Sequence, residues 1–124
     1  MLKSIYIKNF AIIEEIVLEF SNGLNILTGE TGAGKSIIVD AISIAFGERA
    51  SGDLIRNGSN KAIVECIFDL SNIKETIDLS NFDEYIEGSD LIIRREIPIK
   101  GNSRCFINDT PVQTSKLREL SELL

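Results

Sequence analysis

The amino-acid sequence predicts an α/β domain with a mixed sheet, one helix packed on a face of that sheet, and an antiparallel β lobe. Three observations support this fold class. A glycine-rich motif at residues 29–36 lies between a strand-like run and an amphipathic helix pattern. Two strand-like segments precede the motif, and further alternating segments follow it. The chain has 124 residues, 44% of them apolar, which is enough for one small core.

The glycine-rich motif reads Gly29-Glu30-Thr31-Gly32-Ala33-Gly34-Lys35-Ser36 and matches the phosphate-binding pattern G-x-x-x-x-G-K-[ST] at every fixed position. Its glycines let the chain turn so that consecutive backbone N–H groups face phosphate oxygens. Lys35 supplies a positive charge for the β- and γ-phosphates, and the hydroxyl of Ser36 is placed to ligate Mg²⁺. The motif therefore predicts a P-loop; a glycine-rich turn without a ligand is the alternative.

The segments on either side of the motif have the patterns that a P-loop needs. They are strands at residues 2–7, 14–20 and 24–28 and a helix at residues 36–46. Residues 9–13 connect the first two strands. The helix has a broad apolar face, made of Ile37, Ile38, Ala41, Ile42, Ala45 and Phe46, and Gly47 is a natural stop for it.

The second half of the chain predicts three more strands and a second helix. The strands are at residues 62–70, 91–99 and 104–107, and the helix runs from Thr114. The first of them places alternate residues, Cys66 included, in the core, and residues 48–60 before it predict a loop. The other two form a hairpin over about residues 91–108, and Pro98 suggests that its strand lies at a sheet edge.

The C-terminal helix has Thr114 as its expected N-cap and an apolar stripe of leucines: Leu117, Leu120, Leu123 and Leu124. No Gly, Asn or Pro closes the pattern, so we expect the chain to be a fragment of a longer one. The acidic segment at about residues 71–90 carries six acids against one base and predicts a solvated surface lobe with short helices. Arg94, Arg95 and Arg104 predict either a basic strip or charges that blunt a strand edge.

The composition limits the function classes. The net charge of −6 argues against strong nucleic-acid binding by this chain alone. The sequence holds no His, and Cys66 and Cys105 lie far apart, so we expect two reduced thiols and no zinc site. Neither an apolar run long enough for a membrane span nor a signal-peptide pattern is present, which predicts a cytoplasmic protein that does not bind membranes.

Short motifs along nearly the whole chain carry a family resemblance. They are Asn9-Phe10-Ala11-Ile12, residues 29–36, Asp40-Ala41, Gly47-Glu48-Arg49-Ala50, Arg56 with Gly58, Val64-Glu65, Arg94-Arg95-Glu96, Ser103-Arg104 with Phe106-Ile107-Asn108, Pro111-Val112 and Leu117-Arg118-Glu119-Leu120. On these residues the sequence resembles the N-terminal part of the RecN family, bacterial ATPases of DNA double-strand-break repair that are related to the SMC proteins.

The resemblance implies an ATPase head of the ABC and SMC type, built from the two ends of a long chain that an antiparallel coiled coil brings together. It implies that residues 29–36 bind ATP, with Lys35 and Ser36 at the phosphates and Mg²⁺. It also implies that Arg56, or less readily Arg49, approaches a phosphate; a solvated loop arginine is the alternative. The implied partners are the C-terminal half of the head, a second copy of the complete protein, and DNA through the complete protein.

The sequence departs from the family pattern because it ends before the glutamine-bearing loop. It lacks an apolar run ending in Asp-Glu, an LSGG-like signature and coiled-coil heptads. Phosphoryl transfer needs a positioned water and neutralised charge, so we expect this chain to bind ATP but to hydrolyse it poorly alone, while the complete protein is an ATPase.

Other function classes stay open at this point. A small kinase or GTPase is disfavoured because residues 59–62 lack the Asp of a guanine-reading motif and no arginine-rich lid is present. Another SMC-like or ABC-type ATPase lobe, or a nucleotide-binding interaction fragment that does not hydrolyse ATP, are further alternatives.

Overall fold

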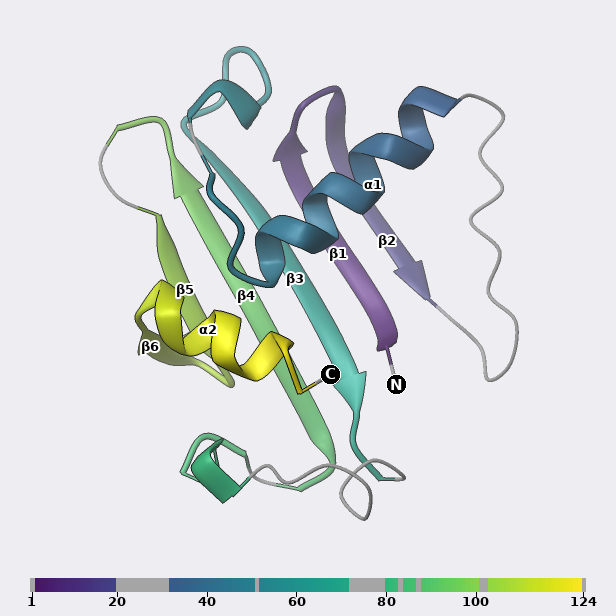
Figure 1. The fold of residues 1–124 in the computed structure, drawn as a ribbon. Coiled ribbons are helices and arrows are strands. Elements are labelled where there is room, and N and C mark those ends of the chain that lie inside the picture. The colour runs from purple at the N-terminus through teal and green to yellow at the C-terminus, as the bar shows by residue number, and fades with distance from the viewer. Residues whose placement is uncertain are drawn as a thin grey trace.

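The described residues form one sheet with two α-helices on one of its faces (Figure 1). The structure is a computed structural model that describes residues 2–19, 32–50, 52–71, 80–82, 84–86, 88–100 and 103–123. Its elements are β1 (Leu2–Phe10), β2 (Ile13–Glu19), α1 (Gly32–Ala45), β3 (Lys61–Asp69), β4 (Asp90–Pro98), β5 (Arg104–Ile107), β6 (Thr110–Val112) and α2 (Thr114–Ser121). Short 3-10 turns lie at Gly52–Leu54 and Ser80–Phe82.

The sheet has the strand order β2-β1-β3-β4-β5-β6. Every pair formed by the described strands is antiparallel. Strand β3, which follows α1 in the sequence, does not pair with β2. It lies on the other side of β1 and pairs with that strand, with Ile7 opposite Val64. The expected mixed sheet needs a parallel strand from elsewhere, and residues 24–28, the expected P-loop strand, lie outside the described residues.

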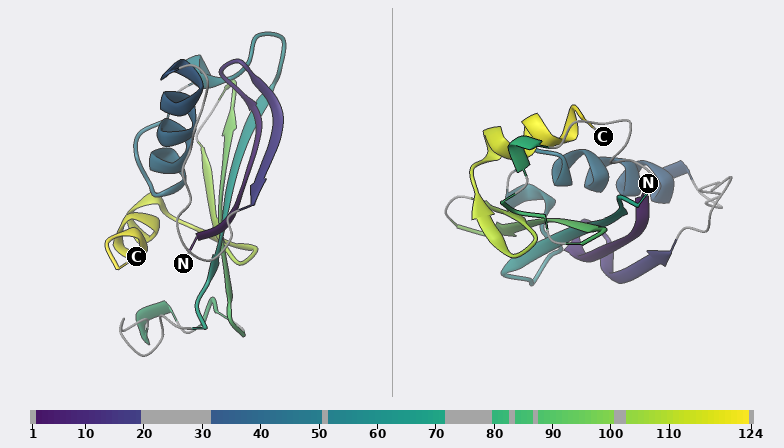
Figure 2. Two further views of the ribbon diagram at one scale, coloured as in Figure 1. Left: turned by 90° about the vertical axis from the view of Figure 1, so that its right-hand side faces the viewer. Right: turned by 90° about the horizontal axis from the view of Figure 1, so that it is seen from below.

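Both helices cover the same face of the sheet, as the side view in Figure 2 shows. The core lies between them and that face, because alternate residues of each strand point to opposite sides. On β3 and at the residue after it, the expected inward set is confirmed: Ala62, Val64, Cys66, Phe68 and Leu70 are all buried. The expected hairpin is also confirmed, since β4 pairs with β5 from Ile93 opposite Ile107 to Glu96 opposite Arg104.

Helix α1 begins at Gly32, four residues before the start that the apolar pattern predicts, because its first turn is the polar end of the motif. It ends at Ala45, and Gly47 just past that end has a φ of 101° that suits glycine, as expected. The N–H of Gly47 donates to the carbonyl of Ile44, and that of Glu48 to the carbonyl of Ser43. These two bonds form a Schellman motif, the usual glycine-dependent end of a helix.

The expectation that Pro98 lies on an edge strand is wrong, because β4 lies between β3 and β5. Pro98 is tolerated there because the N–H of its neighbour Ile99 donates to Asn60, on the β3 side. In an antiparallel ladder adjacent residues face opposite sides, so the missing N–H of Pro98 faces the β5 side. On that side the pairing of the described residues runs only as far as Arg104 opposite Glu96, so no bond between described strands is lost.

Helix α2 corrects a second expectation. Its N-cap is Gln113 rather than Thr114, and the backbone of Gln113 is extended (φ −80°, ψ 155°). The carbonyl of Gln113 accepts from the N–H groups of Lys116 and Leu117. Leu117 and Leu120 of the expected leucine stripe are fully buried.

The loop expected after α1 is confirmed, whereas little of the expected acidic lobe lies in the described residues. The segment after α1 is irregular apart from the turn at Gly52–Leu54, and Ile55 bridges to Phe10 of β1. Most of the acidic side chains at 71–90 lie outside the described residues, but Phe82 is a fully buried anchor there. Within the described part of the chain, neither helix has the length and hydropathy to cross a bilayer.

Candidate nucleotide-binding site

The structure places the second half of the glycine-rich motif in the first turns of α1. The backbone of residues 32–36 is helical, while Gly29, Glu30 and Thr31 lie outside the described residues. The first N–H groups of a helix have no partner within the helix, and its dipole makes this end positive. The first turn of α1 contains no acidic residue to neutralise that end. This backbone fits an anion such as a phosphate group.

Close packing on the sheet fixes the axis of α1. Ala41 and Ala45 are fully buried and Ile44 is 5% exposed, so this side of the helix lies directly on the strands. Small side chains permit this close approach because they leave little space between helix and sheet. Ile44 was absent from the expected apolar face. Val39, on another side of the helix, is 50% exposed.

The C-terminal end of α1 is held by Arg95 of β4, a residue that is only 3% exposed. Its guanidinium donates to the carbonyl of Ile44 at 2.8 Å, to the carbonyl of Glu48, and to Oγ of Ser103 at 3.0 Å. Burial lowers the pKa of Arg95, but arginine stays charged in proteins. A cation here satisfies helix-end carbonyls and faces the negative end of the helix dipole.

A second arginine reaches the same helix end from α2. Nε of Arg118 donates to the carbonyl of Gly47 at 2.8 Å. The contact is close, because a Cβ on Gly47 would lie 2.6 Å from Cγ of Arg118. Residues from four of the sequence motifs, 47–50, 94–96, 103–108 and 117–120, therefore meet around the end of the P-loop helix.

Asn108 fixes the turn between β5 and β6. Asn108 and Asp109 have positive φ values of 45° and 70°, as a two-residue hairpin turn of type I′ requires. The side chain of Asn108 accepts from the N–H of Ile92 and donates to the carbonyl of Tyr85. This part of the resemblance thus has a structural role: it joins the turn to β4 and to the segment before it.

Neither expectation for the three arginines of the hairpin holds. Arg95 points into the core, whereas Arg94 lies on the other face of the sheet, because adjacent strand residues alternate. Arg94 forms an ion pair with Glu96 at 2.8 Å, and Glu96 lies opposite Arg104. The three side chains therefore form no common basic strip, and β4 and β5 are interior strands rather than edges.

Arg56, the expected additional phosphate contact, is half-buried next to the end of β1. Its N–H donates to the carbonyl of Asn9 at 2.9 Å. The turn between β1 and β2 and the first turn of α1 both lie toward the upper end of the sheet in Figure 1. Arg49 is exposed, just past the opposite end of α1. Both remain predictions as nucleotide contacts.

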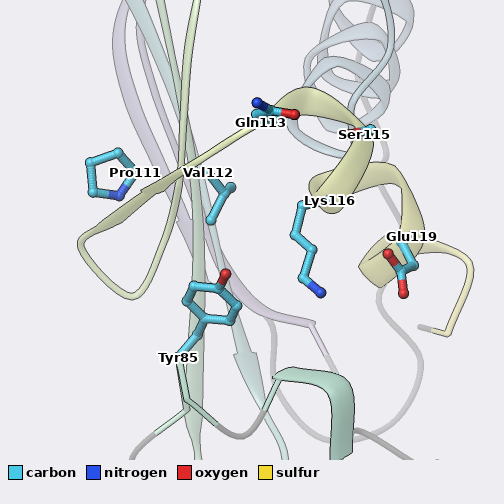
Figure 3. A pocket seen from close by; sticks show the side chains of 7 residues that line it. All are labelled: Tyr85, Pro111, Val112, Gln113, Ser115, Lys116 and Glu119. Atoms are coloured by element: carbon cyan, nitrogen blue, oxygen red, sulfur yellow. The ribbon is translucent and has the colours of Figure 1, made fainter.

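A pocket of about 570 Å³ lies elsewhere, between β6, the start of α2 and Tyr85 (Figure 3). Pro111, Gln113 and Lys116 are among its lining residues, and the Lys116 ammonium lies 4.6 Å from the centre of the Phe82 ring. Figure 1 places α2 beside the last turn of α1, away from the first turn. This pocket is therefore not part of the candidate nucleotide site.

The cysteines behave as expected. Cys66 and Cys105 are both buried free thiols. Burial raises the pKa of the Cys66 thiol to about 12. Among the described residues no cluster of three metal-ligating side chains is present. Ser36 remains the predicted Mg²⁺ ligand.

Comparison with known proteins identifies the family. A family model described as an AAA domain matches residues 4–122. The chain belongs to the AAA domain family. Curated relatives called DNA repair protein RecN match the whole chain, with 42% identity over 124 residues in Vibrio cholerae and 44% over 126 residues in Bacillus subtilis. The resemblance found in the sequence motifs is thereby confirmed. The chain spans 22% of the length of each of these two relatives.

Solved structures confirm the fold of this AAA domain chain. The SMC head domain from Thermotoga maritima is 26% identical, with a TM-score of 0.72 over 96% of this chain and 41% of its own. A structure from work on ATP-driven dimerization and DNA-stimulated activation of SMC ATPases is 23% identical, with a TM-score of 0.78 over 98% of this chain and 78% of its own. The recombination mediator RecF with ATP is 20% identical, with a TM-score of 0.70 over 94% and 30%. The fold is that of a P-loop ATPase of the ABC and SMC head type.

The residues at the far end of α1 were not identified as positioning residues from the sequence. Arg95 was grouped with its neighbours by charge, although strand alternation already assigns it to the face opposite Arg94. The sequence signal that could have identified Arg95 is its place in the inward-facing series Leu91, Ile93, Arg95 and Ile97. Arg118 carried no comparable signal, because its acceptor is a backbone carbonyl 71 residues away.

Proposed function

We propose that this chain is the ATP-binding lobe of a RecN-like protein that acts in DNA double-strand-break repair and recombination. One observation carries the proposal: a complete P-loop motif runs into the start of α1 in a chain that matches RecN relatives along its whole length. We take residues 1–124 as one lobe, with the complete protein converting ATP and water to ADP and phosphate.

The residues have separable roles in nucleotide binding. The backbone N–H groups of residues 29–34 and the start of α1 cradle the phosphates, and Lys35 adds a point charge. The Ser36 hydroxyl holds Mg²⁺, which when bound neutralises phosphate charge. Arg56 is the candidate for one further phosphate contact.

The proposed partners follow from the related proteins. SMC ATPases described with ATP-driven dimerization and DNA-stimulated activation support a homodimer of the complete protein and DNA contact through it. The remaining part of the head is the first partner of this lobe. The site of action would be the bacterial cytoplasm, at the nucleoid.

The test is calorimetric titration of Mg-ATP into the 124-residue chain, with ATP turnover followed in the same samples. We expect saturable binding that is lost in Lys35→Ala, weakened in Arg56→Ala, and kept in Lys100→Ala, a matched change at an exposed lysine of the hairpin. We expect no turnover by the chain alone. Equal heats for the wild-type chain and Lys35→Ala would contradict the nucleotide site.

A further inference from the structure

The C-terminal end of α1 is gripped by two arginines from two other elements. Arg95 of β4 and Arg118 of α2, here called the arginine clamp, donate to the carbonyls of Ile44 and Gly47. The clamp lies at the end of α1 away from the P-loop. It therefore touches the helix that carries the candidate site without touching the site.

The two halves of the clamp differ in how firmly they are fixed. Arg95 is almost completely buried on a central strand, with three acceptors around its guanidinium. Arg118 is an exposed residue of α2, and among the described residues its guanidinium makes one bond, part-buried, to the carbonyl of Gly47. Arg95 thus anchors the helix end to the sheet, whereas the bond of Arg118 is the one that a shift of α2 would break.

A helix transmits a displacement because it is stiff along its axis. With a rise of about 1.5 Å per residue, the 14 residues of α1 form a rod roughly 20 Å long. Phosphate-binding groups must be held to within about 0.5 Å of their working positions. A shift or tilt at the clamped end therefore matters at the P-loop end.

We propose that the arginine clamp positions the P-loop helix for its nucleotide and joins it to α2, so that nucleotide binding and the placement of α2 affect each other. This inference rests on the proposed nucleotide site. Coupling between two sites is reciprocal: if loss of the Arg118 bond weakens nucleotide binding, then bound nucleotide strengthens that bond by the same factor.

The experiment compares Mg-ATP affinity in the whole chain and in its variants Arg118→Ala, Arg118→Lys and Arg104→Ala. We expect Arg118→Ala to weaken binding about 5-fold, the lower end of typical coupling factors. We expect Arg118→Lys to stay within about twofold, since a lysine can still donate to the Gly47 carbonyl. Arg104→Ala removes an arginine on the opposite face of the sheet, and we expect it to bind like the wild-type chain.

Hydrogen exchange supplies a second readout that a purely structural role would not move. We expect Mg-ATP to slow amide exchange in α2 of the wild-type chain, and to have no such effect in Arg118→Ala. The variant is measured at a temperature where its far-UV spectrum shows it folded. The test uses substitutions of Arg118 because a substitution of the buried Arg95 is more prone to prevent folding.

The outcomes separate this inference from the proposed function. Wild-type binding that Lys35→Ala abolishes and Arg118→Ala leaves unchanged would overturn the clamp and keep the nucleotide site. The clamp would also be rejected if Arg118→Ala and Arg118→Lys both bound Mg-ATP more weakly while Mg-ATP did not slow amide exchange in α2 of the wild-type chain. Failure of the wild-type chain to bind Mg-ATP would overturn both proposals.

Discussion

At the scale of single residues, Gly47 shows how one position serves backbone and packing together. Its φ of 101° is a conformation that other residues adopt only with strain, and a Cβ would lie 2.6 Å from the side chain and 3.2 Å from the backbone nitrogen of Arg118. We therefore expect Gly47→Ala to lower the free energy of unfolding by about 2–4 kcal/mol, the sum of backbone strain and overpacking. Urea unfolding followed by circular dichroism measures this loss.

Gly58 provides the matched control. Its φ is also positive, at 86°, but an added Cβ would meet nothing within 4 Å. Gly58→Ala therefore reports the backbone cost alone, about 1–2 kcal/mol for a residue with a Cβ in the left-handed region. If the two variants lose the same stability, the close approach of Arg118 to Gly47 contributes nothing and the packing argument is wrong.

Because of Cys66, the free energy of unfolding should depend on pH above about pH 9. Burial raises the pKa of its thiol to about 12 from an ordinary value of 9.0. The unfolded chain therefore releases this proton near pH 9 while the folded chain keeps it, so stability is complete below pH 9 and falls above it. The expected extra slope is up to about 1.4 kcal/mol per pH unit.

The measurement for Cys66 is chemical unfolding at intervals from pH 8 to 10.5 in the wild-type chain and in Cys66→Ala. The variant loses stability at every pH because of its cavity, so the slopes are compared rather than the absolute values. Parallel slopes above pH 9 would show that the thiol ionises as readily in the folded chain as in the unfolded one.

At the scale of elements, the start of α2 offers a stabilising change. Gln113 has the extended backbone of an N-cap but makes no side-chain capping bond. A shorter oxygen-bearing side chain can accept from the free N–H groups of the first turn. We expect Gln113→Ser to raise the unfolding free energy by about 0.5–1 kcal/mol, and Gln113→Ala to give no gain. Thermal unfolding of the three proteins checks this, and equal gains for Ser and Ala would refute capping.

The sequence predicted the elements better than the contacts between them. Alternation on β3 was enough to assign Val64 and Cys66 to the core, because strand geometry leaves two faces only. The position of Arg95 against the end of α1 was beyond such reasoning. Its acceptors are the carbonyls of Ile44 and Glu48, and backbone carbonyls carry no sequence signature. Likewise the motif predicted the phosphate site, but not what holds the far end of its helix.

At the scale of the whole molecule, the chain order differs from the spatial order at one decisive place. The strand after α1 pairs with β1, so Ile5 lies opposite Cys66 across 61 positions of sequence. Strand patterns alone could not reveal this, since each strand looks the same whichever neighbour it has. The pairing places β3 in the middle of the sheet, where it links the N-terminal hairpin to the C-terminal one.

This position predicts a gradient of local stability across the sheet. Among the described strands, β3 has partners on both sides, β1 and β4, whereas β2 is an edge strand paired only with β1. Amides of β3 can exchange only when both long-range pairings open, which approaches global unfolding; amides on the free edge of β2 need no such opening. We expect hydrogen exchange in β3 to be slowest in the chain and at least about 100-fold slower than at the free edge of β2, a gap of about 2.7 kcal/mol.

Within β2, amides that face β1 serve as the internal control and should exchange at intermediate rates. Equal protection in β2 and β3 would mean that the sheet opens as one unit, and would remove β3 as its central link.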